Sequence, residues 1–270
     1  MLKINNIDVN VKHFPDGTLL LKQDFGVNIN DPIVIEWLFD NNEELVTLIF
    51  LTKHLRSLGH RDISLFLPYI PNARQDRVKN DEDVFTLKYF ADTINWLEFS
   101  CVYVCDPHSS VSEALINNIY VKSPKDFIEK VLDEITDITD NNFMLFYPDE
   151  GAMKRYSGMI NKPYAFGIKN RDWNTGEIKG LDVSGMKELI PNNNILIVDD
   201  ICSRGGTFYH SAKKLKELGA NKVFLYVTHC EKTIFDGEIL NGDLLDRVYT
   251  TDSILRNYHS ITGKIKIFNV

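Results

Sequence analysis

The segment that most constrains the fold is ILIVDDICSRGGTF at positions 195–208, which precedes the helical run YHSAKKLKELG. Its first four residues are apolar and follow a proline and several asparagines, which is typical of a buried parallel strand. We expect this strand to end at Asp199 and Asp200. After the glycines, apolar residues recur at helical spacing from Tyr209 to Gly219, so the helix is expected there.

This order of strand, acidic pair, glycine loop and helix predicts a ligand site. Backbone N–H groups in the loop and the N-terminus of the helix would face one point, where a phosphate is favoured. Asp199 and Asp200 beside that point can accept hydrogen bonds from vicinal hydroxyls. A site that takes a phosphate and a diol is a sugar-phosphate site. An ordinary strand, turn and helix is the alternative for this stretch alone.

Composition excludes some classes of partner. The chain has 270 residues, with 44% hydrophobic and 25% charged, which are ordinary globular values. Its net charge of −8 predicts no binding of nucleic acid, so an anionic substrate must be held by local basic residues or carried with Mg²⁺. We find no signal peptide, no membrane span and no metal-type spacing of the four cysteines. We therefore expect a cytoplasmic protein with reduced thiols.

Apolar strand-like segments alternate with helical segments along the whole chain, which predicts an α/β fold with a mainly parallel sheet in each of two halves. The polar stretch DITDNN at 137–142 is the best linker candidate, so we expect domains at 1–142 and 143–270. Near the start, NVKHF and TLLLK surround Pro15-Asp16-Gly17, which predicts a β-hairpin. The unusual polar residues lie at the carboxyl ends of strands, where ligands bind in such sheets.

Several motifs together resemble one family. VDDICSRGGT resembles the ribose-phosphate loop of the phosphoribosyltransferase fold, and PYIPNARQDR at 68–77 resembles a segment of the ribose-phosphate pyrophosphokinases that plain phosphoribosyltransferases lack. The resemblance runs in the family's order from Phe14 to Thr207. It implies two type I phosphoribosyltransferase-like domains, each with a mainly parallel sheet flanked by helices.

The same resemblance implies an ATP site in the first half. Arg74 would clamp the phosphates through its planar guanidinium, and Gln75 would offer an amide, with Asp76 beside them. Phe14 would stack on adenine and Asp16 would accept from its amino group, often across a subunit interface. Thr18 stands where the family usually has glutamate. A solvated basic loop and a plain hairpin turn are the alternatives for these two stretches.

The resemblance also implies Mg²⁺ ligands. Asp106-Pro107-His108-Ser109 resembles the family loop in which histidine binds Mg²⁺ and contacts ATP, and Asp149 in Pro148-Asp149-Glu150-Gly151 matches a second metal and ribose-phosphate position. Mg²⁺ prefers oxygen ligands, so a structural role for His108 is the alternative.

Lys169 and Arg171 resemble the base of the family's catalytic loop, and the polar stretch DWNTGEIKG that follows them suits a mobile lid. Diphosphate transfer needs mainly cations and positioning, and we expect these two residues to stabilise the transferring group. A solvated basic turn is the alternative. The PDEGAMKR stretch is expected to be a loop that leads into a helix.

The ribose-phosphate site would comprise Asp149 and the acidic pair with the loop residues Ser203, Arg204, Gly205, Gly206 and Thr207. In this loop Ser203 and Arg204 stand where the family usually has aspartate and threonine. The chain also begins close to the hairpin, so we expect the family's first strand to be missing. That departure leaves the family's standard oligomer open, although a homo-oligomer based on dimers is expected.

We therefore expect Mg²⁺-dependent transfer of the diphosphate of ATP to the anomeric hydroxyl of ribose 5-phosphate, with release of AMP. A larger acceptor such as ADP-ribose is the alternative, because Arg204 could meet its extra phosphate. A phosphoribosyltransferase that consumes phosphoribosyl pyrophosphate is a second alternative, and a catalytically inactive regulatory homologue is a third. The ARQDR and KNR segments and His108 argue against the last two.

Overall fold

The computed structural model describes residues 1–139, 142–171, 178–256 and 263–270, with the backbone alone at 169–171 and 178–180. It divides into two compact units, Met1–Ser123 and Pro124–Val270, here called the N-terminal and C-terminal units. Each is described by itself. Among the helices that the structure describes, none is long and apolar enough to span a membrane.

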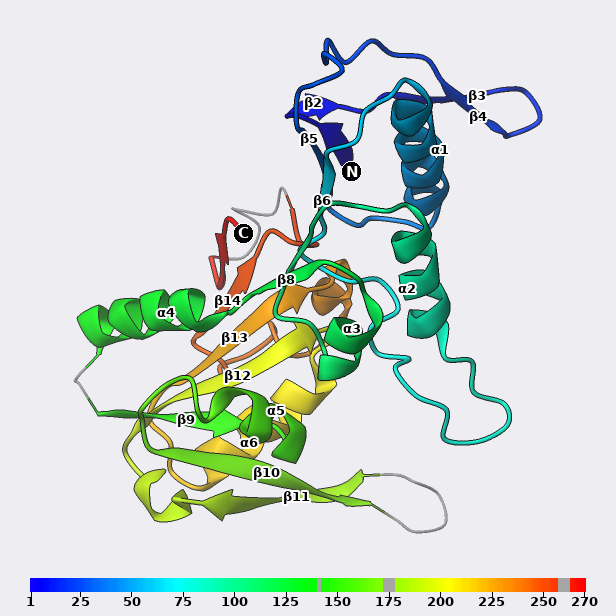
Figure 1. Ribbon diagram of the computed structural model, residues 1–270. Coiled ribbons are helices and arrows are strands. Elements are labelled where there is room, and N and C mark those ends of the chain that lie inside the picture. Colours follow the sequence, from blue (N-terminus) through cyan, green and yellow to red (C-terminus); the bar gives the residue numbers. More distant parts are fainter. Residues whose placement is uncertain (140–141, 172–177, 257–262) are drawn as a thin grey trace. The chain divides into compact units, whose positions relative to one another are not determined.

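The elements of the N-terminal unit (Figure 1) are β1 (Leu2–Ile4), β2 (Ile7–Asp8), β3 (Val11–His13), β4 (Leu19–Leu21), β5 (Ile33–Trp37), α1 (Glu43–Ser57), β6 (Ile63–Phe66), α2 (Thr86–Trp96), β7 (Val102–Cys105), α3 (Ser110–Leu115) and β8 (Ile119–Lys122). Those of the C-terminal unit are α4 (Lys125–Ile138), β9 (Phe143–Tyr147), α5 (Glu150–Tyr156), β10 (Tyr164–Arg171), β11 (Ile178–Gly185), η1 (Lys187–Leu189), β12 (Asn194–Cys202), α6 (Gly206–Glu217), β13 (Val223–Cys230), η2 (Lys232–Asp236), β14 (Arg247–Thr251) and β15 (Ile265–Phe268).

The sheet of the N-terminal unit has the order β2-β1-β5-β6-β7-β8. Strands β5 to β8 are parallel, while β1 pairs antiparallel with β2 and β5. Leu48, Leu51 and Leu55 of α1 recur at helical spacing and are buried in the core beside the strand residues Ile35 and Leu65. The parallel ladder brings the carboxyl ends of β6 and β7 to one edge of this sheet.

The sheet of the C-terminal unit has the order β11-β10-β9-β12-β13-β14-β15, parallel except for the β10–β11 pair. Every residue of β13 is buried, as expected for a central strand that is covered on both faces. The chain moves from β9 to β10 on one side and later to β12 on the other side of β9. The point between β9 and β12 is thus a topological switch point, where open α/β sheets bind ligands. The predicted α/β class with mainly parallel sheets is confirmed.

The division between the units lies before α4, whereas the sequence predicted it after residue 142. Helix α4 is fastened to the C-terminal sheet through Glu134, whose carboxylate pairs with Arg247 and Lys266. Phe127 adds a ring contact to Phe268, with 6.3 Å between the ring centroids. These contacts join residues far apart in the sequence, so the polar composition at 137–142 could not reveal them.

Three local expectations need correction. Strands β1 and β2 precede the hairpin, whereas we expected the chain to lack the strand that comes first in the family. The stretch after Pro148 is not a loop, because α5 begins at Glu150. Helix α6 begins at Gly206, earlier than the expected Tyr209, because Gly205 has φ +78° and turns the chain directly into the helix. The predicted hairpin is confirmed by the antiparallel pairing of β3 with β4.

Candidate functional site

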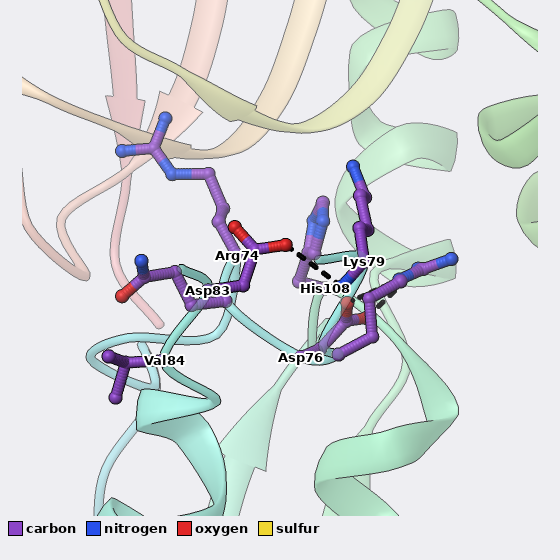
Figure 2. A pocket seen from close by; sticks show the side chains of 8 residues that line it. Arg74, Asp76, Lys79, Asp83, Val84 and His108 are labelled. Carbon is purple, nitrogen blue, oxygen red and sulfur yellow. Dashed lines mark hydrogen bonds and ion pairs between the residues drawn. The ribbon is translucent and has the colours of Figure 1, made fainter. Parts of the chain in front are cut away.

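The N-terminal unit has a polar pocket at the carboxyl edge of its sheet. The pocket holds about 320 Å³ and its lining comes from the loop between β6 and α2 and from the turn after β7: Arg74, Gln75, Asp76, Arg77, Lys79, Asp83, Val84 and His108. Figure 2 shows these side chains around the cavity. The structure thus brings together Arg74, Gln75 and His108, which the sequence placed in one nucleotide site from separate segments. Such a mixture of cations and amide suits a polyphosphate.

Asp76 organises the basic side of this pocket. Its carboxylate is buried and accepts two hydrogen bonds from Arg77, with Nε–Oδ1 at 2.8 Å and Nη2–Oδ2 at 3.2 Å. Burial opposes ionisation of Asp76, but the combined effects of Arg77, Ser109 and His108 outweigh it, so the pKa of Asp76 is lowered. Gln75 is held by Thr86, whose hydroxyl donates to its amide oxygen at 2.7 Å. Arg77 and Thr86 were not among the predicted site residues.

The turn after β7 places its two candidate metal ligands differently. His108 is half-buried and lines the pocket, whereas Asp106 is 4% exposed and is not part of the described lining. Asp106 has φ +44°, in the left-handed region, and its N–H donates to the Lys122 carbonyl oxygen at 3.1 Å. Of the two candidate ligands, only His108 belongs to the described lining of the pocket.

The tip of the hairpin lies away from the pocket. Phe14 is 49% exposed, and neither Phe14 nor Asp16 belongs to the described lining. Figure 1 shows the β3–β4 hairpin at the opposite end of this unit from the loop between β6 and α2. Asp16 accepts from the N–H and the hydroxyl of Thr18, which lower its pKa. The pocket and the hairpin tip of one chain are therefore separate.

In the C-terminal unit, charged residues gather at the switch point between β9 and β12. Asp149 lies two residues after the end of β9 and caps α5, where its carboxylate accepts from the Ala152 N–H at 3.0 Å. Arg155 on α5 reaches β12, and its Nη2 lies 3.1 Å from Asp199 Oδ1 and 2.7 Å from Asp200 Oδ1. The short helix thus carries the cation that pairs with the predicted diol-binding carboxylates.

The acidic pair lies inside its strand, which corrects the expectation that the strand ends there. β12 continues to Cys202, and its pairing with β13 includes Ile201 with His229. Burial, and after it the charge of Asp200, raises the pKa of Asp199 well above its usual value, while Arg155 opposes the shift. Asp149 adds a smaller repulsion. Arg155 was missed because nothing in PDEGAMKR indicates its partner on another strand.

The loop Ser203–Thr207 connects β12 to the N-terminus of α6, as predicted. Arg204 is exposed, and Gly205 is buried in the left-handed region. The Ser203 hydroxyl donates to Glu231 Oε2 at 2.7 Å. Gly206 and Thr207 open the helix, so their N–H groups have no partner within it and are suited to an anion. Glu231 was not predicted.

Lys169 and Arg171 lie in β10, opposite Leu181 and Ile178 of β11. Their side chains lie outside the described part of the structure, so their predicted roles stay predictions. The proposed lid begins at Asp172, and residues 172–177 also lie outside the described residues. The rest of the stretch belongs to β11.

The candidate magnesium ligands belong to both units: Asp106 and His108 to the first, Asp149 to the second. Among the residues that the structure describes, no group of three or more His, Cys, Asp or Glu side chains could hold a metal. The donors of each unit by themselves still fit Mg²⁺ that arrives with a nucleotide, because Mg²⁺ commonly takes one or two protein carboxylates together with phosphate oxygens and water. The capping bond at Asp149 leaves its carboxylate further acceptor sites.

Comparison with known proteins agrees with this arrangement. Residues 1–97 match the family described as the N-terminal domain of ribose phosphate pyrophosphokinase. A ribose-phosphate pyrophosphokinase of Saccharolobus solfataricus is 25% identical over 85% of this chain and 78% of its own length. That of Pyrococcus abyssi is 29% identical over 83% of this chain and 77% of its own.

This chain is similar to the ribose-phosphate pyrophosphokinases over most of its length. The fold agrees, since the crystal structure of phosphoribosylpyrophosphate synthetase from Mycobacterium smegmatis matches with a TM-score of 0.80 and 18% identity, over 97% of this chain and 86% of that one. The predicted pair of phosphoribosyltransferase-like domains is therefore confirmed. Many further curated proteins also match, among them the ribose-phosphate pyrophosphokinases of Sulfurisphaera tokodaii and Thermococcus kodakarensis.

Proposed function

We propose that the chain transfers the diphosphate of ATP to the anomeric hydroxyl of a ribose 5-phosphate-type acceptor and releases AMP. The observation that carries this proposal is the pocket that joins Arg74, Gln75 and His108. These residues come from two separate segments, and each was assigned to ATP from the sequence. The relatives named ribose-phosphate pyrophosphokinase support the same activity.

In this proposal the N-terminal pocket binds ATP. Arg74 meets the phosphate oxygens through two parallel N–H donors, and Gln75 is held in place by Thr86 to receive the nucleoside. Phe14 and Asp16 serve the adenine of a neighbouring subunit in a homo-oligomer. Their exposure at the hairpin tip, outside the pocket of their own chain, supports that division of roles.

The C-terminal unit binds the acceptor. Asp199 and Asp200 accept hydrogen bonds from the ribose hydroxyls, and Arg155 keeps both carboxylates fixed before the sugar arrives. The N–H groups at the start of α6, with Ser203 to Thr207, hold the 5-phosphate. A well-oriented acceptor recovers several kcal/mol of the barrier, on the order of 7 or more in favourable cases.

In the reaction the anomeric oxygen bonds to the β-phosphorus of ATP, and the bond from that phosphorus to the oxygen of the α-phosphate breaks. AMP leaves with that oxygen, and the hydroxyl proton passes to solvent. Lys169 and Arg171 stabilise the negative charge that builds on the transferring group. Asp149, His108 and Asp106 are the residues that would hold Mg²⁺, which when bound supplies positive charge to the phosphate oxygens.

Anion-exchange chromatography of a reaction with ATP, Mg²⁺ and ribose 5-phosphate tests the proposal. We expect AMP and a diphosphorylated product in equal amounts. Hydrolysis without transfer would yield AMP without that product and would contradict the proposal, as would the absence of AMP. A phosphoribosyltransferase would instead consume phosphoribosyl pyrophosphate and form no AMP from ATP.

ADP-ribose is a second candidate acceptor, which the loop itself favours. Arg204 is an exposed cation beside the start of α6, and its carbonyl oxygen lies directly against Gly237, which fixes the backbone from which its side chain extends. A phosphate that continues beyond the 5-position would meet this guanidinium. The same chromatographic assay with ADP-ribose decides between the acceptors, and Arg204→Thr should lower the activity with ADP-ribose alone.

A further inference from the structure

The segment that follows β13 forms the support of the loop between β12 and α6. The two chain segments leave neighbouring strands, since Cys202 pairs with Cys230 at the ends of β12 and β13. The N–H of Glu231 then donates to the carbonyl oxygen of Cys202 at 2.8 Å. From there on, residues of 231–239, here called the support segment, contact the loop.

Glu231 makes the polar part of this contact. Its Oε2 accepts from the Ser203 hydroxyl at 2.7 Å and from the Thr233 hydroxyl at 3.2 Å. The two hydroxyl oxygens are themselves 3.1 Å apart. Carboxylate oxygens only accept, so the Ser203 proton points to Glu231 and not to a ligand on the loop. Hydrogen bonds to an ionised acceptor are also the stronger kind.

A backbone contact and an apolar contact fix the two residues after Ser203. A Cβ on Gly237 would collide with the carbonyl oxygen of Arg204, so the two backbones touch there. A Cβ on Gly205 would lie 2.6 Å from Ile239 Cγ2, and Gly205 already has φ +78°. Three consecutive loop residues are therefore each held by a different residue of the support segment.

We propose that Glu231 is a positioning residue for the phosphate of the acceptor. By holding the Ser203 hydroxyl, with Thr233 as the second donor, it keeps the loop in the turn that exposes the first N–H groups of α6. The phosphate is then bound by backbone N–H groups and Thr207, while Ser203 acts through its bond to Glu231. This inference rests on the proposed function, because it assigns the loop to the acceptor.

Kinetics of Glu231→Ala test this role. We expect the KM for the ribosyl acceptor to rise about tenfold or more, since a hydrogen bond to a charged group is worth about 1.5–3 kcal/mol. The KM for ATP and kcat should stay unchanged. Glu231→Gln should show a smaller rise, because its amide oxygen can still accept from Ser203. Glu238→Ala removes an exposed carboxylate from the same segment and should change nothing.

A double-mutant cycle with Ser203→Ala separates positioning from general damage. If Glu231 acts through Ser203, the double variant should have the acceptor KM of the worse single variant. The proposal would be overturned if the rises in acceptor KM of the two single variants multiplied in the double variant. An equal rise in the KM for ATP would also overturn it. A normal melting temperature of Glu231→Gln with a raised acceptor KM would distinguish positioning from loss of folding.

Calorimetric binding of ribose 5-phosphate and of ADP-ribose keeps this test separate from the proposed function. If the intact protein binds either sugar but forms no product, the proposed reaction fails, and weaker binding by Glu231→Ala still supports the positioning role. Equal binding by this variant overturns the role even when the enzyme is active. If the intact protein binds neither sugar, both proposals fail.

Discussion

Arg77 in the N-terminal pocket is largely exposed to water, whereas Arg155 in the C-terminal unit is largely enclosed. Arg77 keeps 65% of its side-chain surface exposed beside the buried Asp76. Arg155, by contrast, is 24% exposed, and its partner Asp200 only 4%. An exposed guanidinium can remain available for an incoming phosphate at little cost. A buried carboxylate pair cannot remain ionised without a partner.

This difference fits the ligands assigned to the two sites. ATP brings several negative charges, and an open basic loop can meet them after a small loss of hydration. A ribose diol brings no charge, so it can approach the acidic pair, whose charge Arg155 partly offsets. On the proposed function, Arg155 would hold the acidic pair in place before the sugar binds.

The largest expected effect concerns chemistry. Lys169→Ala should lower kcat about 100- to 1,000-fold, as removal of one transition-state donor does, with little change in the KM for ATP. Steady-state AMP formation measures it. The exposed Lys162→Ala in the same unit serves as the control. A raised KM for ATP at unchanged kcat would place Lys169 in nucleotide binding. It would contradict the assignment of ATP binding to the N-terminal unit.

Arg155→Met should destabilise the protein by about 3 kcal/mol, the lower end for a broken buried pair, because Arg155 is partly exposed. Two enclosed carboxylates would lose their cation. Urea unfolding measures the change. The double variant Arg155→Met with Asp200→Asn should regain part of it. Arg247→Ala should cost less than about 1 kcal/mol, since Lys266 still pairs with Glu134.

Arg74→Ala should raise the KM for ATP by roughly tenfold or more and leave the acceptor KM unchanged. Arg74→Lys should recover only part of the loss, because an ammonium lacks the two parallel donors. The exposed Arg61→Ala, outside the pocket, is the matched control. If the acceptor KM rose instead, the assignment of this pocket to ATP would be wrong.

The smallest effect concerns Asp76, whose pKa is lowered in the folded state. A carboxylate with a lowered pKa stabilises the fold above its unfolded pKa of about 4, and this contribution disappears as the pH falls through the folded value. Asp76→Asn should therefore cost less than about 1 kcal/mol at pH 7 and progressively less as the pH falls from about 4 towards about 2. Urea unfolding at both ends of this pH range measures this cost. An equal cost at both would show that it does not come from the ion pair between Asp76 and Arg77.

Much of the fold follows from local patterns. The apolar run that begins at Ile195 lies in β12 as expected, and the hairpin forms around Pro15-Asp16-Gly17 as expected. These elements depend on residues close in the sequence, namely apolar spacing and turn propensity. The extension of β12 to Cys202 does not, because it depends on pairing with β13. From the neighbouring sequence alone, Asp199 and Asp200 resemble the end of a strand.

The sequence by itself determined the alternation of strands and helices, the order of the motifs and the kinds of side chain at each strand end. The tertiary structure decided which of these side chains meet. Arg155 and Asp199 are 44 positions apart, and Ser203 and Glu231 are 28 apart. No periodicity links residues at such separations. Their contact is set by the order of strands in the sheet, which places the ends of β9, β12 and β13 at one edge.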